Sequence, residues 1–271
     1  MDLILITGET EEAQLAEKIG IEYVMVDLET VGKAKRQKNT NSLLSGHTIQ
    51  DVSKIRKQLF NSKLMVRINP ISKASYKEIN EVIELGADAL LLPMFRKSAE
   101  VTEFLRLVNG RAECHLLLET ATALARLDSI LVSPGITSIH IGLNDLHIEM
   151  KLTFMFELLS SGLIDFACSK IKQAGIKFGI GGIGRVGGHS LIPPEIILQE
   201  HIRLGSKQVI LSRDFKKIGP DENEFDIMKS ITDLREIITE LELDKPMNIS
   251  HGPSETLKNL VNSVINSIEL K

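Results

Sequence analysis

The chain lacks several features that would place it in a broad functional class. Its 32 basic and 36 acidic residues give a net charge of -4. Lys and Arg do not gather into a stripe, which argues against an extended nucleic-acid-binding surface. No apolar run approaches the roughly 18 residues that a membrane span requires. We therefore expect neither nucleic acid nor a membrane as a partner.

Cysteine is scarce, and the basic segment of a signal peptide is missing from the start of the chain. The first apolar run, residues 3–6, is short, so we expect a first strand there rather than a secretion signal. The two cysteines, Cys114 and Cys168, have no metal-ligand spacing. We expect both to be reduced, buried thiols in a cytoplasmic protein.

Short apolar runs alternate regularly with longer amphipathic segments. The runs are rich in Val, Ile and Leu, which is typical of parallel strands covered on both faces. A doubly wound sheet would share much of this pattern. The number of runs and the polar residues at their ends favour a (β/α)8 TIM barrel over residues 1–243. The expected strands are 3–7, 23–27, 64–69, 89–93, 115–119, 138–142, 177–182 and 208–212.

Capping patterns predict where helices begin and end. Ser75 with Glu78 forms one expected capping box, and Thr48 with Asp51 forms another expected start. Gly86 is a plausible stop for the first of these helices.

The residues after the barrel, 244–271, read as a linker followed by one more helix. Ser254 is the expected cap, and an apolar stripe follows it at helical spacing. This stripe must pack on the barrel's own surface or on a neighbouring subunit. We expect a homo-oligomer, a trimer or a hexamer. The stripe consists of Leu257, Leu260, Val261, Val264, Ile265 and Ile268.

In a barrel the reactive groups lie at the carboxyl ends of the strands. Glu119 and Asp145 follow the fifth and sixth expected strands, and two carboxylates plus water suit Mg²⁺ or Mn²⁺. Alternatively, Glu119 caps the next helix and Asp145 pairs with a neighbouring base. Arg67, in the third strand, is either a substrate contact or a surface ion pair with Asp27 or Glu29.

The candidates for proton transfer and charge recognition lie in the loop after the second strand. A histidine such as His47 suits proton transfer near neutral pH, although it equally suits a simple helix start. Lys33 and Arg36 could bind an acidic group of the substrate, or form a solvated basic loop.

The stretch Gly179–Gly188 contains GxGxxG twice. A dinucleotide fingerprint follows the first strand of a βαβ unit, whereas this stretch comes at the seventh strand, so we reject that interpretation. Backbone amides at Gly181 and Gly182 would instead meet a phosphate or second carboxylate of the substrate, with Arg185 nearby. A merely flexible loop is the alternative.

Five stretches, in order over residues 20–215, resemble the HpcH/HpaI aldolase and citrate lyase beta-subunit family. This family is a metal-dependent branch of the phosphoenolpyruvate/pyruvate TIM barrels. Any single stretch would be weak evidence, but five in the family's order are specific. They are Val26–Glu29, Val66–Pro70, Gly86–Asp88 with Leu92–Met94, Leu117–Thr120 and Ile141–Leu146.

The resemblance implies a divalent-metal-dependent carbon–carbon lyase, a class II-type aldolase that cleaves or forms a 2-oxo acid through a pyruvate-type enolate. Its partners would be that 2-oxo acid and an aldehyde or acyl group. Glu119 and Asp145 would hold Mg²⁺, Mn²⁺ or another divalent ion. Arg67 would contact the oxo acid, and Met94 lies among the expected substrate contacts.

One position departs from the family pattern. Thr30 stands where aldolase members carry a histidine and lyase members usually an aspartate, which leaves His47 as our candidate base. A CoA-ester lyase of the citryl- or malyl-CoA type is the close alternative, although no extended basic patch offers itself to a CoA nucleotide. A non-catalytic metabolite-binding barrel is the other.

Overall fold

The computed structural model describes residues 1–32, 46–188, 190–215, 224–243 and 252–270. The predictions for Lys33 and Arg36 lie outside these residues. Within the described part of the chain, no helix combines the length and the apolar character needed to span a membrane.

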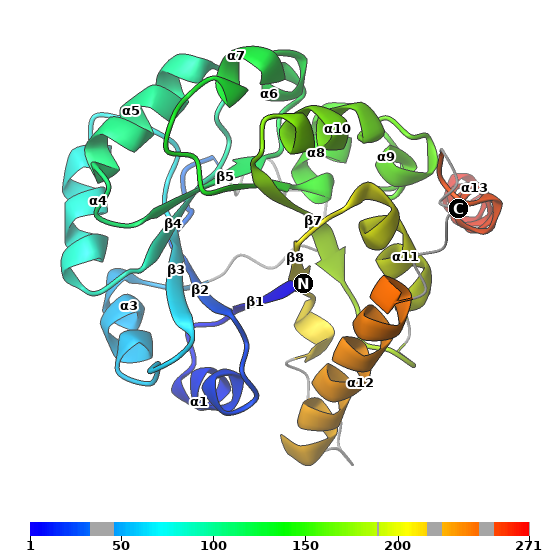
Figure 1. Ribbon diagram of the computed structural model, residues 1–271, viewed down its shortest axis with the longest axis horizontal. Coiled ribbons are helices and arrows are strands. Elements are labelled where there is room, and N and C mark those ends of the chain that lie inside the picture. The colour runs from blue at the N-terminus through cyan, green and yellow to red at the C-terminus, as the bar shows by residue number, and fades with distance from the viewer. Residues whose placement is uncertain (33–45, 189, 216–223, 244–251, 271) are drawn as a thin grey trace.

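Eight parallel strands close into a barrel in chain order, with β8 returning to pair with β1 (Figure 1). Every expected strand overlaps an observed one, so the prediction of a (β/α)8 TIM barrel is confirmed. The strands are β1 (Asp2–Ile6), β2 (Tyr23–Asp27), β3 (Lys63–Arg67), β4 (Ala89–Leu92), β5 (Glu113–Leu118), β6 (Ser138–Ile141), β7 (Lys177–Ile183) and β8 (Gln208–Leu211).

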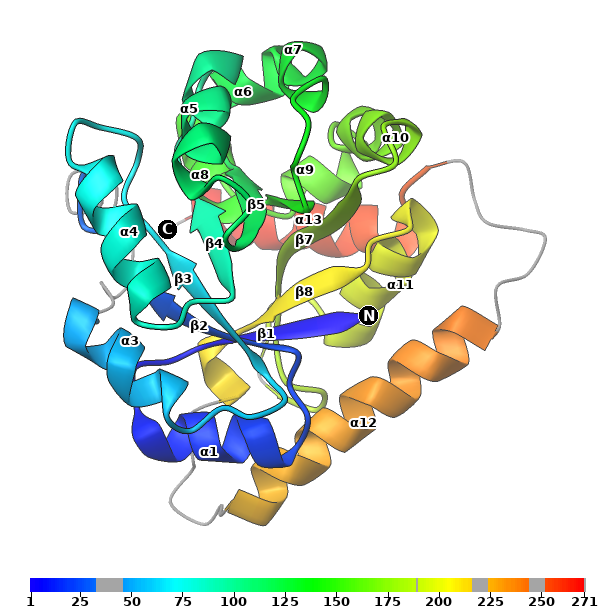
Figure 2. The ribbon, with the colours of Figure 1, turned by 60° about the vertical axis from the view of Figure 1, so that its left-hand side comes forward.

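Helices surround the barrel and bury their apolar faces against it (Figures 1 and 2). In α4, for example, Ile79 and Val82 are fully buried, as their spacing predicts. The helices up to the last barrel helix are α1 (Thr10–Lys18), α3 (Ile49–Arg56), α4 (Ser75–Glu84), α5 (Ser98–Val108), α6 (Ala121–Ala125), α7 (Leu127–Leu131), α8 (Leu143–Glu149), α9 (Glu157–Ser160), α10 (Asp165–Gln173), α11 (Pro194–Leu204) and α12 (Glu224–Leu243).

One of the two predicted helix starts is confirmed, and the other is wrong in detail. The backbone N–H of Thr48 donates to Asp51 at 2.7 Å, as a capping box requires. Ser75, however, is already the first residue of α4, and its hydroxyl oxygen accepts from the N–H of Ser72. Glu78 instead accepts from Asn69, because the turn after β3 lies within its reach.

The barrel interior and the outer layer form separate apolar cores. The interior core contains Ile4, Tyr23, Met25, Met65, Ala89, Leu91 and Leu117. The larger outer core lies between strands and helices, and both cysteines are buried as free thiols. Burial raises the pKa of the Cys114 thiol to about 11.

Polar side chains close the amino-terminal end of the barrel. The Glu113 carboxylate accepts hydrogen bonds from Tyr23 Oη at 2.9 Å and from Lys63. His115 lies beside them, with Nε2 3.2 Å from Glu113 and Nδ1 2.6 Å from the Ser138 hydroxyl. Hydrogen bonds from His115, Lys63 and Tyr23 lower the pKa of Glu113 to about 2 despite its partial burial.

The final helix, α13 (Glu255–Glu269), packs on the barrel's own surface along α9 and α11 (Figure 1). Ser254 caps it as predicted, since its hydroxyl accepts from the N–H of Leu257 at 3.1 Å. Leu257 and Val261 are fully buried there. The backbone N–H of Ser254 also donates to Glu200 of α11, which fixes the start of α13.

Candidate functional site

The centre of the candidate site is an ion pair at the carboxyl-terminal rim, where the strands end. Asp27 and Arg67 are register partners on β2 and β3, so their side chains emerge side by side. The guanidinium donates twice to Asp27, from Nε at 2.8 Å and from Nη2 at 2.6 Å. The Arg67 side chain is 14% exposed and that of Asp27 is 2% exposed, so the pair is buried rather than superficial.

A second carboxylate approaches the same guanidinium. An oxygen of Glu29 lies 3.7 Å from Arg67 Nε. Burial alone would lower the pKa of Arg67, but the charges of Asp27, Glu29 and Glu119 raise it instead. Arg67 therefore stays charged at the rim.

Glu119 follows β5 and is almost completely buried. Thr120, not Glu119, caps α6, because the Thr120 hydroxyl accepts from the N–H of Ala123. Glu119 Oε1 accepts from the backbone N–H of Met94 at 3.0 Å. Burial and the charge of Asp145, opposed by the charge of Arg67, together raise the pKa of Glu119 to about 8.

Asp145 lies in the first turn of α8, directly after β6. Gly142, between β6 and α8, makes room for its neighbour: a Cβ there would lie 2.8 Å from Glu119 Cβ and 3.1 Å from Glu119 Oε2. The glycine therefore lets Glu119 lie against the start of α8. The structure thus brings both Arg67 and Asp145 within electrostatic reach of Glu119.

The donor set suits a hard divalent cation. Mg²⁺ and Mn²⁺ prefer oxygen ligands such as carboxylates. Burial and the charge of Asp145 raise the pKa of Glu119, so a cation beside this carboxyl group would stabilise its charged form. Among the described residues no larger cluster of His, Cys, Asp and Glu gathers around a common point. Glu119 and Asp145 would supply two carboxylate ligands of this kind.

His47 reaches the rim near the ends of β1 and β2. Its Nδ1 accepts from the backbone N–H of Asp27 at 3.1 Å, so the neutral ring carries its proton on Nε2. The ring lies on Gly8, where a Cβ would come within 2.8 Å of His47 Cδ2. In this tautomer Nε2 carries the ring proton, so proton uptake at Nε2 requires the other tautomer.

Thr30 is exposed, and the turn that carries it is fixed by Asn69. The backbone N–H groups of Thr30 and Val31 both donate to Asn69 Oδ1, at 2.9 and 3.0 Å. The Thr30 hydroxyl lies 3.4 Å from the same oxygen. The Thr30 side chain, at the position that departs from the family pattern, is thus directed to the turn that follows β3.

The glycine stretch divides between a strand and a loop. Gly181 and Gly182 lie within β7, at an irregularity in its pairing with β8. A Cβ on Gly181 would lie 2.8 Å from Leu143 of α8. The Gly181 carbonyl accepts a hydrogen bond from His140 Nε2. Arg185 donates through Nε and Nη2 to the Ser230 hydroxyl of α12.

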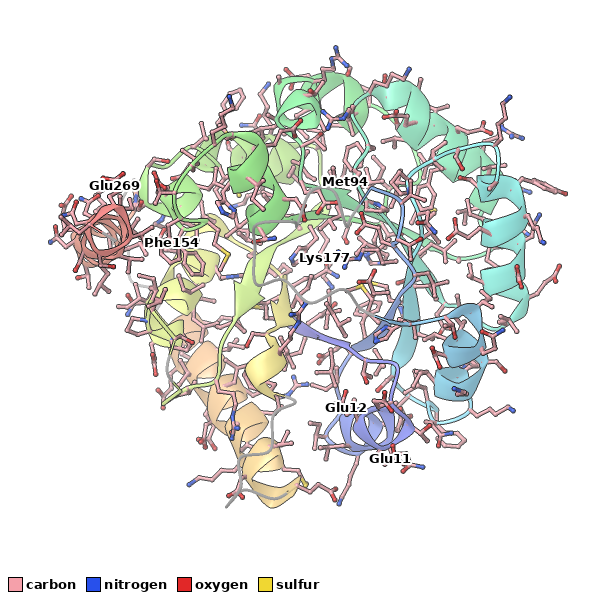
Figure 3. All side chains as sticks on the ribbon, turned by 180° about the vertical axis from the view of Figure 1, so that it is seen from behind. Glu11, Glu12, Met94, Phe154, Lys177 and Glu269 are labelled. Carbon is pink, nitrogen blue, oxygen red and sulfur yellow. The ribbon has the colours of Figure 1, made fainter. Side chains whose placement is uncertain are left out.

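The backbone of Met94 is a part of the site that sequence reasoning missed. Met94 has a φ of 56°, which is uncommon for a residue with a side chain. This conformation accompanies the hydrogen bond from its N–H to Glu119, and Figure 3 shows Met94 beside the ring of strands. The sequence held no signal for it, because Pro-Met is not a pair that favours a left-handed residue.

Comparison with solved structures supports the fold. An HpcH/HpaI aldolase from Desulfitobacterium hafniense DCB-2 is 12% identical, with a TM-score of 0.61 over 90% of this chain and 95% of that one. An HpcH/HpaI aldolase/citrate lyase family protein from Burkholderia cenocepacia J2315 is 14% identical, with a TM-score of 0.61 over 87% and 93%. RipC from Yersinia pestis is 16% identical, with a TM-score of 0.57 over 85% and 94%.

The sequence itself decides the family. A search of curated proteins gives no significant match. The family model described as HpcH/HpaI aldolase/citrate lyase matches residues 9–189, which is more than half of the chain and includes Arg67, Glu119 and Asp145. The chain belongs to the HpcH/HpaI aldolase/citrate lyase family.

Proposed function

We propose that this lyase-family barrel is a divalent-metal-dependent carbon–carbon lyase that cleaves or forms a 2-oxo acid through a pyruvate-type enolate. The observation that carries the proposal is the state of Glu119. It is buried, it lies within the electrostatic reach of Asp145 and Glu29, and among the described residues Arg67 and the backbone N–H of Met94 partly offset its charge. A bound cation would stabilise the charged form of Glu119.

Mg²⁺ or Mn²⁺, held by Glu119 and Asp145, would supply Lewis acidity to the ketone of a 2-oxo acid. Arg67 would present its guanidinium to the oxo-acid oxygens, where negative charge develops as the adjacent carbon–carbon bond breaks. Because Asp27 already orients the guanidinium with two hydrogen bonds, little reorganisation is needed. Met94, Gly181 and Gly182 would contact the rest of the substrate.

His47 would take part in proton transfer at the carbon next to the ketone, as the base that removes a proton and the acid that returns it. Removal by Nε2 requires the tautomer with its proton on Nδ1, so the hydrogen bond from Asp27 N to Nδ1 would have to break when the substrate binds. The aldehyde or acyl partner of the reaction would occupy the open side of the rim.

A second candidate function is a non-catalytic barrel that binds a metabolite. The exposed Thr30, whose hydroxyl lies near Asn69, favours it because a threonine is not a base at neutral pH. Isotope exchange into pyruvate separates the two functions, because a barrel that only binds its ligand does not exchange the C3 protons.

Glu119 should make stability depend on pH in the metal-free protein. Its pKa is about 8 in the folded state, against roughly 4.3 in an unfolded chain, so the folded state holds the extra proton between those values. Its contribution to stability is therefore present below about pH 4.3 and lost as the pH rises through about 8. Urea titrations from pH 5 to 9 should show Glu119→Gln gaining stability relative to the wild type as pH rises. Parallel pH profiles would contradict the raised pKa.

Glu119→Gln and Asp145→Asn should each weaken Mn²⁺ binding at least tenfold while the fold is kept. Each change replaces an anionic ligand by a neutral amide of similar size. Calorimetry with Mn²⁺ measures the affinity, and circular dichroism checks the fold. Glu103→Gln, an exposed carboxylate on α5, is the matched control and should bind as the wild type does. Wild-type Mn²⁺ affinity in Glu119→Gln and Asp145→Asn would contradict the assignment of these two residues as metal ligands.

Arg67→Lys should weaken pyruvate or oxalate binding at least tenfold in the presence of Mn²⁺. Lysine keeps the charge but loses the planar pair of donors that a carboxylate accepts. Lysine is preferred to alanine because alanine would leave Asp27 buried without its partner. Arg106→Lys on α5 serves as the control. Unchanged affinity by calorimetry would place Arg67 outside the substrate site.

His47→Ala should abolish the exchange of pyruvate C3 protons with deuterated water, followed by proton NMR. The loss is expected because the variant lacks the imidazole that would remove the C3 proton and return a deuteron. His47→Gln can still accept from Asp27 N through its amide oxygen, so it separates proton transfer from the packing of the loop. Normal exchange rates in both variants would assign proton transfer to another group.

A further inference from the structure

Glu149, the last residue of α8, joins three segments of the rim through its two carboxylate oxygens. Oε1 accepts from Arg96 Nη1 at 2.6 Å, and Oε2 accepts from the backbone N–H of Ala121 at 2.8 Å. Arg96 belongs to the segment after β4, and Ala121 to the segment after β5. One side chain therefore connects the segments that follow β4, β5 and β6.

These segments are the ones that carry the candidate metal site. Ala121 comes two residues after Glu119, and Arg96 comes two residues after Met94, whose N–H donates to Glu119. Asp145 and Glu149 are four residues apart in the same short helix, so they lie on the same side of it. The contacts of Glu149 thus fix the helix of one ligand against the segment of the other.

The partner side of this contact is itself held in place. The backbone N–H of Arg96 donates to Glu100 at 2.6 Å, and Arg126 Nη1 donates to the Arg96 carbonyl at 3.2 Å. Arg96 is therefore anchored to α5 and to the junction of α6 and α7 before it reaches Glu149. A displacement of α8 would have to break a contact with a fixed partner.

We propose that Glu149 is a positioning residue that sets the spacing of Glu119 and Asp145 for a divalent cation. The inference rests on the proposed function, because it assigns Glu149 a purpose in that metal site. The Arg96–Glu149 pair is partly exposed, with side chains 46% and 29% accessible, and exposed pairs contribute little to global stability. Its effect belongs to the geometry of the site, since groups that orient metal ligands commonly change metal affinity by ten- to a hundredfold.

The test measures Mn²⁺ affinity by calorimetry together with the thermal midpoint of unfolding. Glu149→Ala removes both contacts and should raise the Mn²⁺ dissociation constant about tenfold, with a small change in the midpoint. Glu149→Gln keeps an oxygen for the Ala121 N–H, so its dissociation constant should fall between those of Glu149→Ala and the wild type. Glu103→Ala, which breaks the exposed pair with Arg106 on α5, is the matched control and should leave the affinity unchanged.

A double-mutant cycle assigns the effect to the observed contact. Arg96→Ala should weaken Mn²⁺ binding less than Glu149→Ala, because the Ala121 contact remains, and the two changes should be non-additive. Wild-type affinity in Glu149→Ala, alongside lost affinity in Glu119→Gln, would overturn the positioning role alone. Wild-type affinity in Glu119→Gln would overturn the metal site and this inference with it.

Discussion

The charge balance of the rim depends on the pair of Arg67 and Asp27. Their side chains meet because β2 and β3 pair in a register that places the two residues opposite each other. The charges of Asp27, Glu29 and Glu119 all act on this guanidinium, and the guanidinium in turn opposes the rise in the pKa of Glu119 that burial and the charge of Asp145 cause. If this register were lost, Arg67 and Asp27 would separate and each would be left as a buried charge away from the other. The electrostatics of the site therefore depend on the pairing of β2 with β3.

Much of the fold could be predicted from the sequence because the physics of a barrel strand is local. A strand covered on both faces needs a short, nearly continuous apolar run, and each of the eight runs gives a strand. The capped final helix also follows from the spacing of its apolar residues. The start of α4 was mispredicted because Glu78 contacts Asn69, a partner from another segment that no local pattern reveals. The irregular pairing of β7 likewise depends on its neighbour β8.

The charged residues of the site could be predicted from the sequence, but the orientations of its side chains and backbone groups could not. Arg67, Glu119 and Asp145 stand at strand ends, where the fold directs reactive groups, and their relation to the family's motifs is readable in the sequence. The proton position on His47 depends on a hydrogen bond from Asp27, twenty residues away. The left-handed backbone of Met94 and the contacts of Glu149 arise only when segments after β4, β5 and β6 are brought together. The sequence therefore indicates which chemical groups lie at the rim, whereas tertiary contacts determine the orientation of each group.

The polar network at the amino-terminal end of the barrel connects side chains from the strands β2, β3, β5 and β6. The Glu113 carboxylate accepts hydrogen bonds from Tyr23 and Lys63 and lies beside His115 Nε2. The other ring nitrogen of His115 contacts the Ser138 hydroxyl. These contacts hold four strands together at one end of the barrel, so that end serves the stability of the fold, while Arg67, Glu119 and Asp145 lie at the other end.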